Sequence, residues 1–210
     1  MNKLGDLSCN EFLTELASAA PAPGGGGGAA MAGALAAALA SMVANLTIGK
    51  EKFAECEPEV KELLKQAEAE RVRLLTLVDE DAAVFNSFMS CYKLPKTTDE
   101  EKAARTAAIR AAAKQAATVP LNIARSSFAV LKLADRLVVA GNPGVITDGA
   151  CSGLLARAAL RCAEYNVRIN LGLTKDEVWN AQAAADLKKL LADAEALETR
   201  LLAVTDKALQ

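Results

Sequence analysis

The chain has 210 residues, with 24 Lys and Arg against 26 Asp and Glu and no histidine. The missing histidine excludes Ser-His-Asp and Cys-His nucleophile systems and His-ligated metal or haem sites, so acid–base chemistry falls to Asp, Glu, Lys, Tyr, Cys or a bound water. The formal net charge of −2 gives no support for nucleic-acid binding.

The first predicted element is a helix from Ser8 to about residue 19. Ser8 and Glu11 have the spacing of a capping box. Residues 1–15 contain acids and no apolar core, so we expect no signal peptide. The run PAPGGGGG at 21–28 is expected to be an extended loop, because glycine weakens a helix interior.

A second helix is expected over about 28–48, inside a segment without charges. Residues 29–49 have about the length of a membrane span. Small residues dominate them and no aromatic belt flanks them, which favours a buried core helix over a membrane helix.

The rest of the chain is predicted to form further helices. Pro58 suits the first turn of a long helix over about 58–92. Capping boxes at Thr98 with Glu101 and at Thr174 with Glu177 predict two more helix starts. The remaining signals are a kink or new start at Pro120, a stop at 141–144 and a helix over about 148–171.

These elements predict an all-α protein. We expect one domain over 1–210, built as a single bundle of six to seven helices with long Ala-rich central helices. The five cysteines include no C-x-x-C pair, which is typical of a reduced, cytoplasmic protein.

Asp81 is a polar residue on an otherwise apolar stripe, between Val78 and Phe85. A carboxylate there is desolvated unless it is paired. It is therefore either an acid–base group with a perturbed pKa or half of a structural ion pair, with Arg71 or with a lysine from another helix.

The helix at 148–171 has two polar faces. The face expected to be solvated holds Arg157, Arg161, Glu164 and Arg168, and the opposite face holds Asp148, Ser152, Asn166 and Asn170. Two asparagines one turn apart on a buried face need partners, either a ligand or another helix. Asp148 has a second reading as a helix N-cap.

The glycine run and the lysines after the uncharged helix also allow two readings. Backbone N–H groups before a helix bind anions, but a flexible loop gives the same sequence. Lys50 and Lys52 follow the C-terminal end of the uncharged helix, where positive charges interact favourably with the helix dipole. The alternative is that they bind a carboxylate-rich ligand. Residue patterns alone thus leave open an enzyme or a helical binding or assembly module.

Several segments resemble the cyclodeaminase/cyclohydrolase family of tetrahydrofolate enzymes. They are PAPGGGGGAAMAGALAAALASMVANLTIGKEKF (21–53), DEDAAVFNSFMSCYKLPK (79–96), GNPGVITDGA (141–150) and NVRIN (166–170). Two positions depart from the family pattern, because Gly27 and Thr147 stand where serine is usual. Thr147 keeps a hydroxyl and Gly27 loses one.

The resemblance implies an all-helical homodimer with a folate substrate, no permanently bound cofactor and no metal. Charge and composition, as described above, lead us to expect no nucleic-acid partner and no membrane. The resemblance also implies a methenyltetrahydrofolate cyclohydrolase, which converts 5,10-methenyltetrahydrofolate and water to 10-formyltetrahydrofolate. The alternative is a formiminotetrahydrofolate cyclodeaminase, which closes the 5-formimino form and releases ammonia. The sequence does not choose between them, although the absence of a formiminotransferase domain in the chain favours the cyclohydrolase.

The hypothesis for the site combines the resemblance with the polar residues described above. Asp81, Asp148 and Lys96 are the candidate catalytic residues. Candidate substrate-binding residues are Gly24, Gly25, Gly26, Lys50, Lys52, Asn142, Thr147, Asn166 and Asn170.

Overall fold

A computed structural model describes residues 3–210, and these contain six α helices and no strand. The helices are α1 Cys9–Leu16, α2 Gly25–Asn45, α3 Glu57–Cys91, α4 Asp99–Ala140, α5 Ile146–Thr174 and α6 Glu177–Ala208. Three short 3-10 helices are η1 Leu4–Asp6, η2 Glu51–Phe53 and η3 Pro143–Val145. The predicted all-α class with six to seven helices is confirmed.

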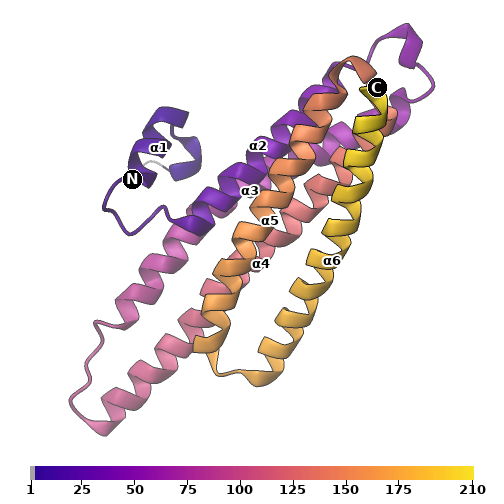
Figure 1. Cartoon of the computed structure of the whole chain (residues 1–210). Helices are drawn as coiled ribbons and strands as arrows, with labels where there is room; N and C mark the ends of the chain where they lie inside the picture. The colour runs from indigo at the N-terminus through magenta and orange to yellow at the C-terminus, as the bar shows by residue number, and fades with distance from the viewer. Residues whose placement is uncertain (1–2) are drawn as a thin grey trace.

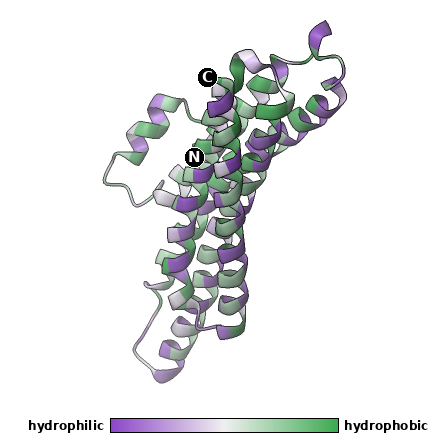
Figure 2. Ribbon diagram, turned by 45° about the vertical axis from the view of Figure 1, so that its right-hand side comes forward, coloured by the Kyte–Doolittle hydropathy of each residue, from purple (hydrophilic) through white to green (hydrophobic). Residues whose placement is uncertain are grey.

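The long helices α2 to α6 run side by side, and α1 lies beside the start of α2 (Figure 1). The α3–α4 hairpin extends beyond the turn that joins α5 to α6. Hydrophilic residues gather at the tip of this hairpin and around η2, whereas the central helices are largely hydrophobic (Figure 2). The core therefore follows the middle of the bundle.

Helix α2 has the length and apolar composition of a membrane span, but most of it is buried inside the bundle. It packs on α3, α4 and α5. Small residues allow this close approach: a Cβ on Gly33 would lie 3.0 Å from Leu74 Cδ2 and from Ser127 Oγ. The uncharged segment thus has the burial of a core helix, as predicted.

Two of the three predicted capping boxes are confirmed. The Ser8 hydroxyl accepts from the Glu11 N–H, and the Ser8 N–H donates to the Glu11 carboxylate, so α1 starts where predicted. Thr98 and Glu101 form the same pair of bonds at the start of α4.

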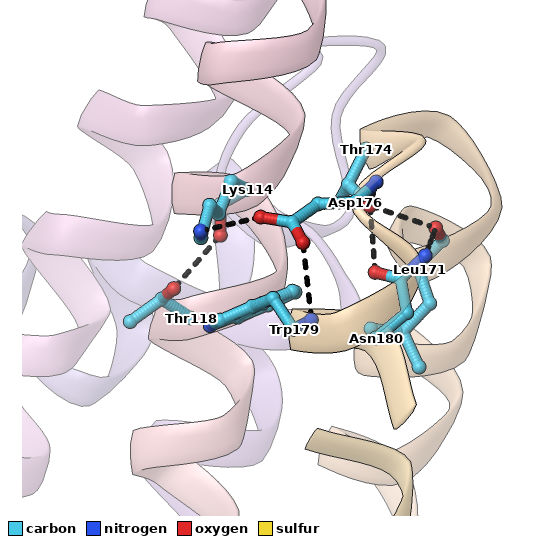
Figure 3. A network of polar contacts seen from close by, with 7 residues as sticks. All are labelled: Lys114, Thr118, Leu171, Thr174, Asp176, Trp179 and Asn180. Atoms are coloured by element: carbon cyan, nitrogen blue, oxygen red, sulfur yellow. Dashed lines mark hydrogen bonds and ion pairs between the residues drawn. The ribbon is translucent and has the colours of Figure 1, made fainter. Parts of the chain in front are cut away.

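The third capping box is wrong. Thr174 ends α5, and Asp176 caps α6 by accepting from the Trp179 N–H at 3.0 Å. The Thr174 hydroxyl instead donates to the Asn180 side chain at 2.6 Å (Figure 3). A second acceptor two residues later in the chain competed for the same role, and spacing does not rank the two.

The new helix start that was one of two expectations for Pro120 is also absent, because α4 runs through it as one helix of 42 residues. Proline removes one helical hydrogen bond and crowds the carbonyl four residues earlier. A helix tolerates it where another donor takes that carbonyl, and α5 supplies one here, as described below.

The predicted solvated face of α5 is only partly correct. Glu164 is buried, and its carboxylate is paired with Arg161 at 2.6 Å and Arg168 at 3.3 Å. On the opposite face Ser152 is fully buried and donates to the Ala36 carbonyl of α2 at 2.7 Å. Ser152 therefore joins two helices.

Candidate functional site

A cavity of about 330 Å³ opens where α2 begins and where α3, α4 and α5 pass alongside. Its lining consists of Pro21, Ala22, Gly24, Gly25, Gly26, Asp81, Val84, Phe85, Phe88, Ala116, Val119, Pro120, Asn166, Ile169, Asn170 and Leu173. Six predicted site residues thus meet in one place, although they come from three segments far apart in the chain.

The glycine run belongs to a helix rather than to an extended loop. Helix α2 begins at Gly25, so Gly25 to Gly28 form its first turn and the prediction of a loop over 21–28 is wrong for these four. The physical reason is contact with α3. A Cβ on Gly26 would overlap the Asp81 carboxylate, so only glycine lets this turn approach Asp81.

Asp81 lies against the open end of α2. The first N–H groups of an α helix have no carbonyl partner within the helix, and they carry partial positive charge. Burial raises the pKa of the Asp81 carboxyl above its ordinary value, and a hydrogen bond from the Gly27 N–H partly offsets that rise. Arg71 pairs with Glu68 rather than with Asp81, so the ion-pair reading with Arg71 fails.

The other walls of the cavity are largely apolar. Phe85 and Phe88 come from α3, and Phe88 meets Tyr92 edge to face with ring centroids 5.3 Å apart. Ile169 and Leu173 face them from α5. A slot of this kind suits a flat heterocycle, with Asp81 as the ionisable side chain in its lining.

Two amides on α5 complete the polar lining. Asn166 donates from its side chain to the Cys162 carbonyl at 2.9 Å, and its amide lies beside Gly25. Asn170 donates to the Asn166 carbonyl at 2.8 Å and to the Ala116 carbonyl of α4 at 2.9 Å. Both residues therefore keep an amide oxygen for a ligand.

Residues 8–189 match the sequence family described as Formiminotransferase-cyclodeaminase. The chain belongs to this family. It is 44% identical over 197 residues to a methenyltetrahydrofolate cyclohydrolase from Methylorubrum extorquens, covering 94% of this chain and 95% of that protein.

Bifunctional relatives are more distant. The formimidoyltransferase-cyclodeaminase of Sus scrofa is 33% identical over 88% of this chain, which spans 34% of that protein. The solved structure of a formiminotetrahydrofolate cyclodeaminase from Thermotoga maritima superposes with a TM-score of 0.88 at 29% identity, covering 98% of both chains. The similarity thus covers the whole bundle, including the cavity.

The departure from the family pattern at Gly27 bears directly on Asp81. A Cβ at this position would lie 3.3 Å from Pro23 Cβ and 3.9 Å from the Asp81 Oδ2 atom. A serine hydroxyl there would reach the carboxylate. With Gly27 in place, only the backbone N–H of this residue reaches Asp81.

The structure places five predicted site residues at the other end of α2, away from the cavity. They are Lys50, Lys52, Asn142, Thr147 and Asp148. Asn142 is bound within the chain: its side chain donates to the Leu46 carbonyl at 3.1 Å and accepts from the Gly144 N–H at 3.0 Å. Asn142 therefore joins the α4–α5 turn to the end of α2 and is committed to these structural bonds.

Lys96 lies in the exposed loop between α3 and α4 and does not line the cavity. The other ten residues of the lining are absent from the predicted site, and Phe88 and Pro120 illustrate why. Phe88 belongs to an apolar stripe, which core residues also form, and Pro120 reads as a helix break. Neither has a local signal that separates a cavity wall from packing.

Proposed function

We propose that this protein is a methenyltetrahydrofolate cyclohydrolase. The observation that carries the proposal is the Asp81 carboxyl, half-buried between the first turn of α2 and an apolar slot. The chain is also similar over 94% of its length to a named cyclohydrolase. The pterin ring of the substrate would lie in the slot, with the methenyl carbon next to Asp81.

The chemistry follows from a carboxyl of raised pKa. Asp81 as carboxylate accepts one proton from a water molecule while the water oxygen bonds to the methenyl carbon between N5 and N10. The protonated carboxyl then donates that proton to N5 as the carbon–N5 bond breaks. The second water proton leaves to solvent, and the formyl group stays on N10. These steps use water and acid–base groups, with no permanently bound cofactor.

The second candidate is the cyclodeaminase reaction. The structural similarity to the Thermotoga maritima cyclodeaminase favours it. The two reactions share a tetrahedral carbon bridging N5 and N10 and differ in whether water enters or ammonia leaves. Parallel assays with 5,10-methenyltetrahydrofolate and 5-formiminotetrahydrofolate separate them, the first by loss of methenyl absorbance and the second by ammonia release.

Asp81→Asn tests the catalytic role. The amide keeps the size of the carboxylate but cannot accept the proton, so we expect turnover to fall by at least about 10²-fold. Glu80→Gln, on an exposed neighbour outside the cavity, is the control and should keep turnover. Turnover of Asp81→Asn within about threefold of wild type, a difference under about 1 kcal/mol, would remove Asp81 from the mechanism.

We also propose that the protein works as a homodimer in the cytoplasm. Helices α2 and α5 pack on each other, and both leave large apolar side chains exposed. Leu35 is 56% exposed, Tyr165 59% and Ile169 72%. Apolar surface of this kind marks an interaction site, and a second copy of the same surface covers it symmetrically. Five free cysteines support a reducing compartment.

An antiparallel dimer accounts for the residues that one chain leaves apart. Helix α2 has 21 residues, about 32 Å in length. A two-fold axis across this helix sets the start of one copy against the end of the other. Lys50, Lys52 and Asp148 of one protomer would then lie near the cavity of its partner.

A further inference from the structure

Pro120 leaves one carbonyl of α4 without its helical partner. A proline has no N–H, so the Ala116 carbonyl four residues earlier receives no bond from residue 120. The side chain of Asn170, on α5, donates to this carbonyl at 2.9 Å. The missing bond within α4 is therefore replaced by a bond from α5, at the wall of the cavity.

This bond fixes the orientation of the Asn170 amide. A side-chain amide has two N–H donors, and those of Asn170 are both used, by the Ala116 carbonyl and by the Asn166 carbonyl. The reversed amide would set its oxygen against two carbonyl oxygens. Within residues 3–210 no hydrogen bond uses the Asn170 amide oxygen, so this oxygen is left for a ligand.

A polar network holds the end of α5 in place against α4 (Figure 3). Lys114 of α4 pairs with Asp176 at 2.8 Å, directly after the last turn of α5. Asn180 of α6 donates to the Leu171 carbonyl at 2.9 Å. Asn170 directly precedes Leu171 and lies six residues before Asp176, so its distance to α4 is fixed by more than its own bond.

We propose that Asn170 is a specificity-determining residue, oriented by Pro120 so that it can only accept a hydrogen bond from the substrate. The inference rests on the proposed function, because it concerns the same cavity. Asn166 adds a second amide oxygen to the lining, while Asp81 faces the methenyl carbon in the proposed reaction. The matching ligand is the donor edge of a reduced pterin, formed by its 2-amino group and N3–H.

The test is a cycle of four proteins: wild type, Asn170→Ala, Pro120→Ala and the double variant. Pro120→Ala restores an N–H that can bond the Ala116 carbonyl. Asn170→Ala should therefore lower the urea midpoint clearly when Pro120 is present and little when the chain also carries Pro120→Ala. Equal losses of stability in both backgrounds would overturn the coupling between Pro120 and Asn170.

Substrate recognition is read separately, as KM and kcat for 5,10-methenyltetrahydrofolate. We expect Asn170→Ala to raise KM about three- to tenfold when Pro120 is present, the size of one hydrogen bond, and to leave kcat within about twofold. The rise in KM should be smaller when the chain also carries Pro120→Ala, because the Asn170 amide is then no longer held in one orientation. An unchanged KM together with lost stability would overturn the role in specificity and leave Asn170 as a helix-joining residue.

A direct binding measurement distinguishes failure of this inference from failure of the proposed function. Tetrahydrofolate and its 2-desamino analogue are titrated into wild type and Asn170→Ala by calorimetry. We expect wild type to prefer tetrahydrofolate and the variant to lose most of that preference. Equal preference in both proteins would overturn the inference alone, whereas wild type that binds neither ligand would overturn the proposed function as well.

Discussion

At residue 26 the first turn of α2 has room for a hydrogen atom and for no carbon, because the Asp81 carboxylate occupies the space of a Cβ. Two residues later the situation is reversed. A Cβ on Gly28 would meet only the Leu16 Cδ2 atom, at an ordinary distance of 3.9 Å. Neighbouring glycines in one turn thus have different physical reasons to be glycine.

This difference gives a matched pair of variants. Gly26→Ala should displace Asp81 and lower both the melting temperature and kcat/KM, the latter by at least about tenfold. Gly28→Ala should raise stability by up to about 1 kcal/mol, because alanine favours the helix, and leave kcat/KM unchanged. Thermal unfolding and steady-state kinetics check both. Similar behaviour of the two variants would contradict the contact between Gly26 and Asp81.

The sequence predicted part of this site for physical reasons that can be named. Asp81 stood out because a carboxylate on an apolar stripe is costly, and Asn170 because an amide on a buried face needs partners. Asn142 is also a polar residue in a distinctive segment, yet its partners lie 96 residues away along the chain at Leu46 and in its own turn. The local sequence pattern does not reveal which polar side chains already have hydrogen-bond partners within the folded chain.

Among the elements, the starts of α1, α3 and α4 were predictable from a cap or a first-turn proline, whereas the start of α6 was not. Helix α4 begins at its capping box, and α3 starts close to Pro58. The continuity of α4 through Pro120 was not predictable, because it depends on a donor from α5. The capping-box pattern favours Thr174 as the cap of α6, because Asp176 lacks the acid three residues later that the box requires.

Asp176→Ala checks the observed cap. Asp176 accepts from Lys114 and from the Trp179 N–H, and these two bonds, in that order, hold the pKa of its carboxyl below the ordinary value. A lowered pKa in the folded state stabilises the protein above the pKa of the unfolded chain, and this stabilisation is lost as the pH falls through the folded value. We expect Asp176→Ala to lower the melting temperature by a few degrees at pH 7, with a smaller difference towards about pH 3.

Glu177→Ala is the matched control for this cap. Glu177 is exposed, and spacing alone places it in the predicted capping box. Its loss should change the melting temperature little at either pH. A larger effect from Glu177→Ala than from Asp176→Ala would restore the Thr174 capping box.

At the scale of the whole molecule, the antiparallel dimer that we propose predicts complementation between inactive variants. Suppose that Asp81 of one protomer and Asp148 of its partner form one site. A heterodimer of Asp81→Asn with Asp148→Asn then has one site with both residues mutated and one site with both residues intact. Random mixing then restores about a quarter of wild-type turnover. The measurement is turnover after the two variants are unfolded together and refolded.

The control is an interface variant, Leu35→Asp, added to both chains. It should abolish the recovered turnover and shift the mass in sedimentation, whereas Val178→Asp, on an even more exposed residue of α6, should do neither. No recovery from mixed variants, with each variant inactive alone, would place both residues in the same protomer.

The uncharged helix α2 also has a consequence for biosynthesis. It leaves the ribosome well before α4 and α5, which later cover it, and α5 ends at Thr174, 129 residues after Asn45. At common rates of translation, that interval is on the order of ten seconds. During it the nascent chain presents its most apolar segment with only α3 of its three main partners available to cover it. Alanine and glycine, rather than leucine and isoleucine, dominate that segment, so the side chains that later permit close packing also limit aggregation while the chain is still being made.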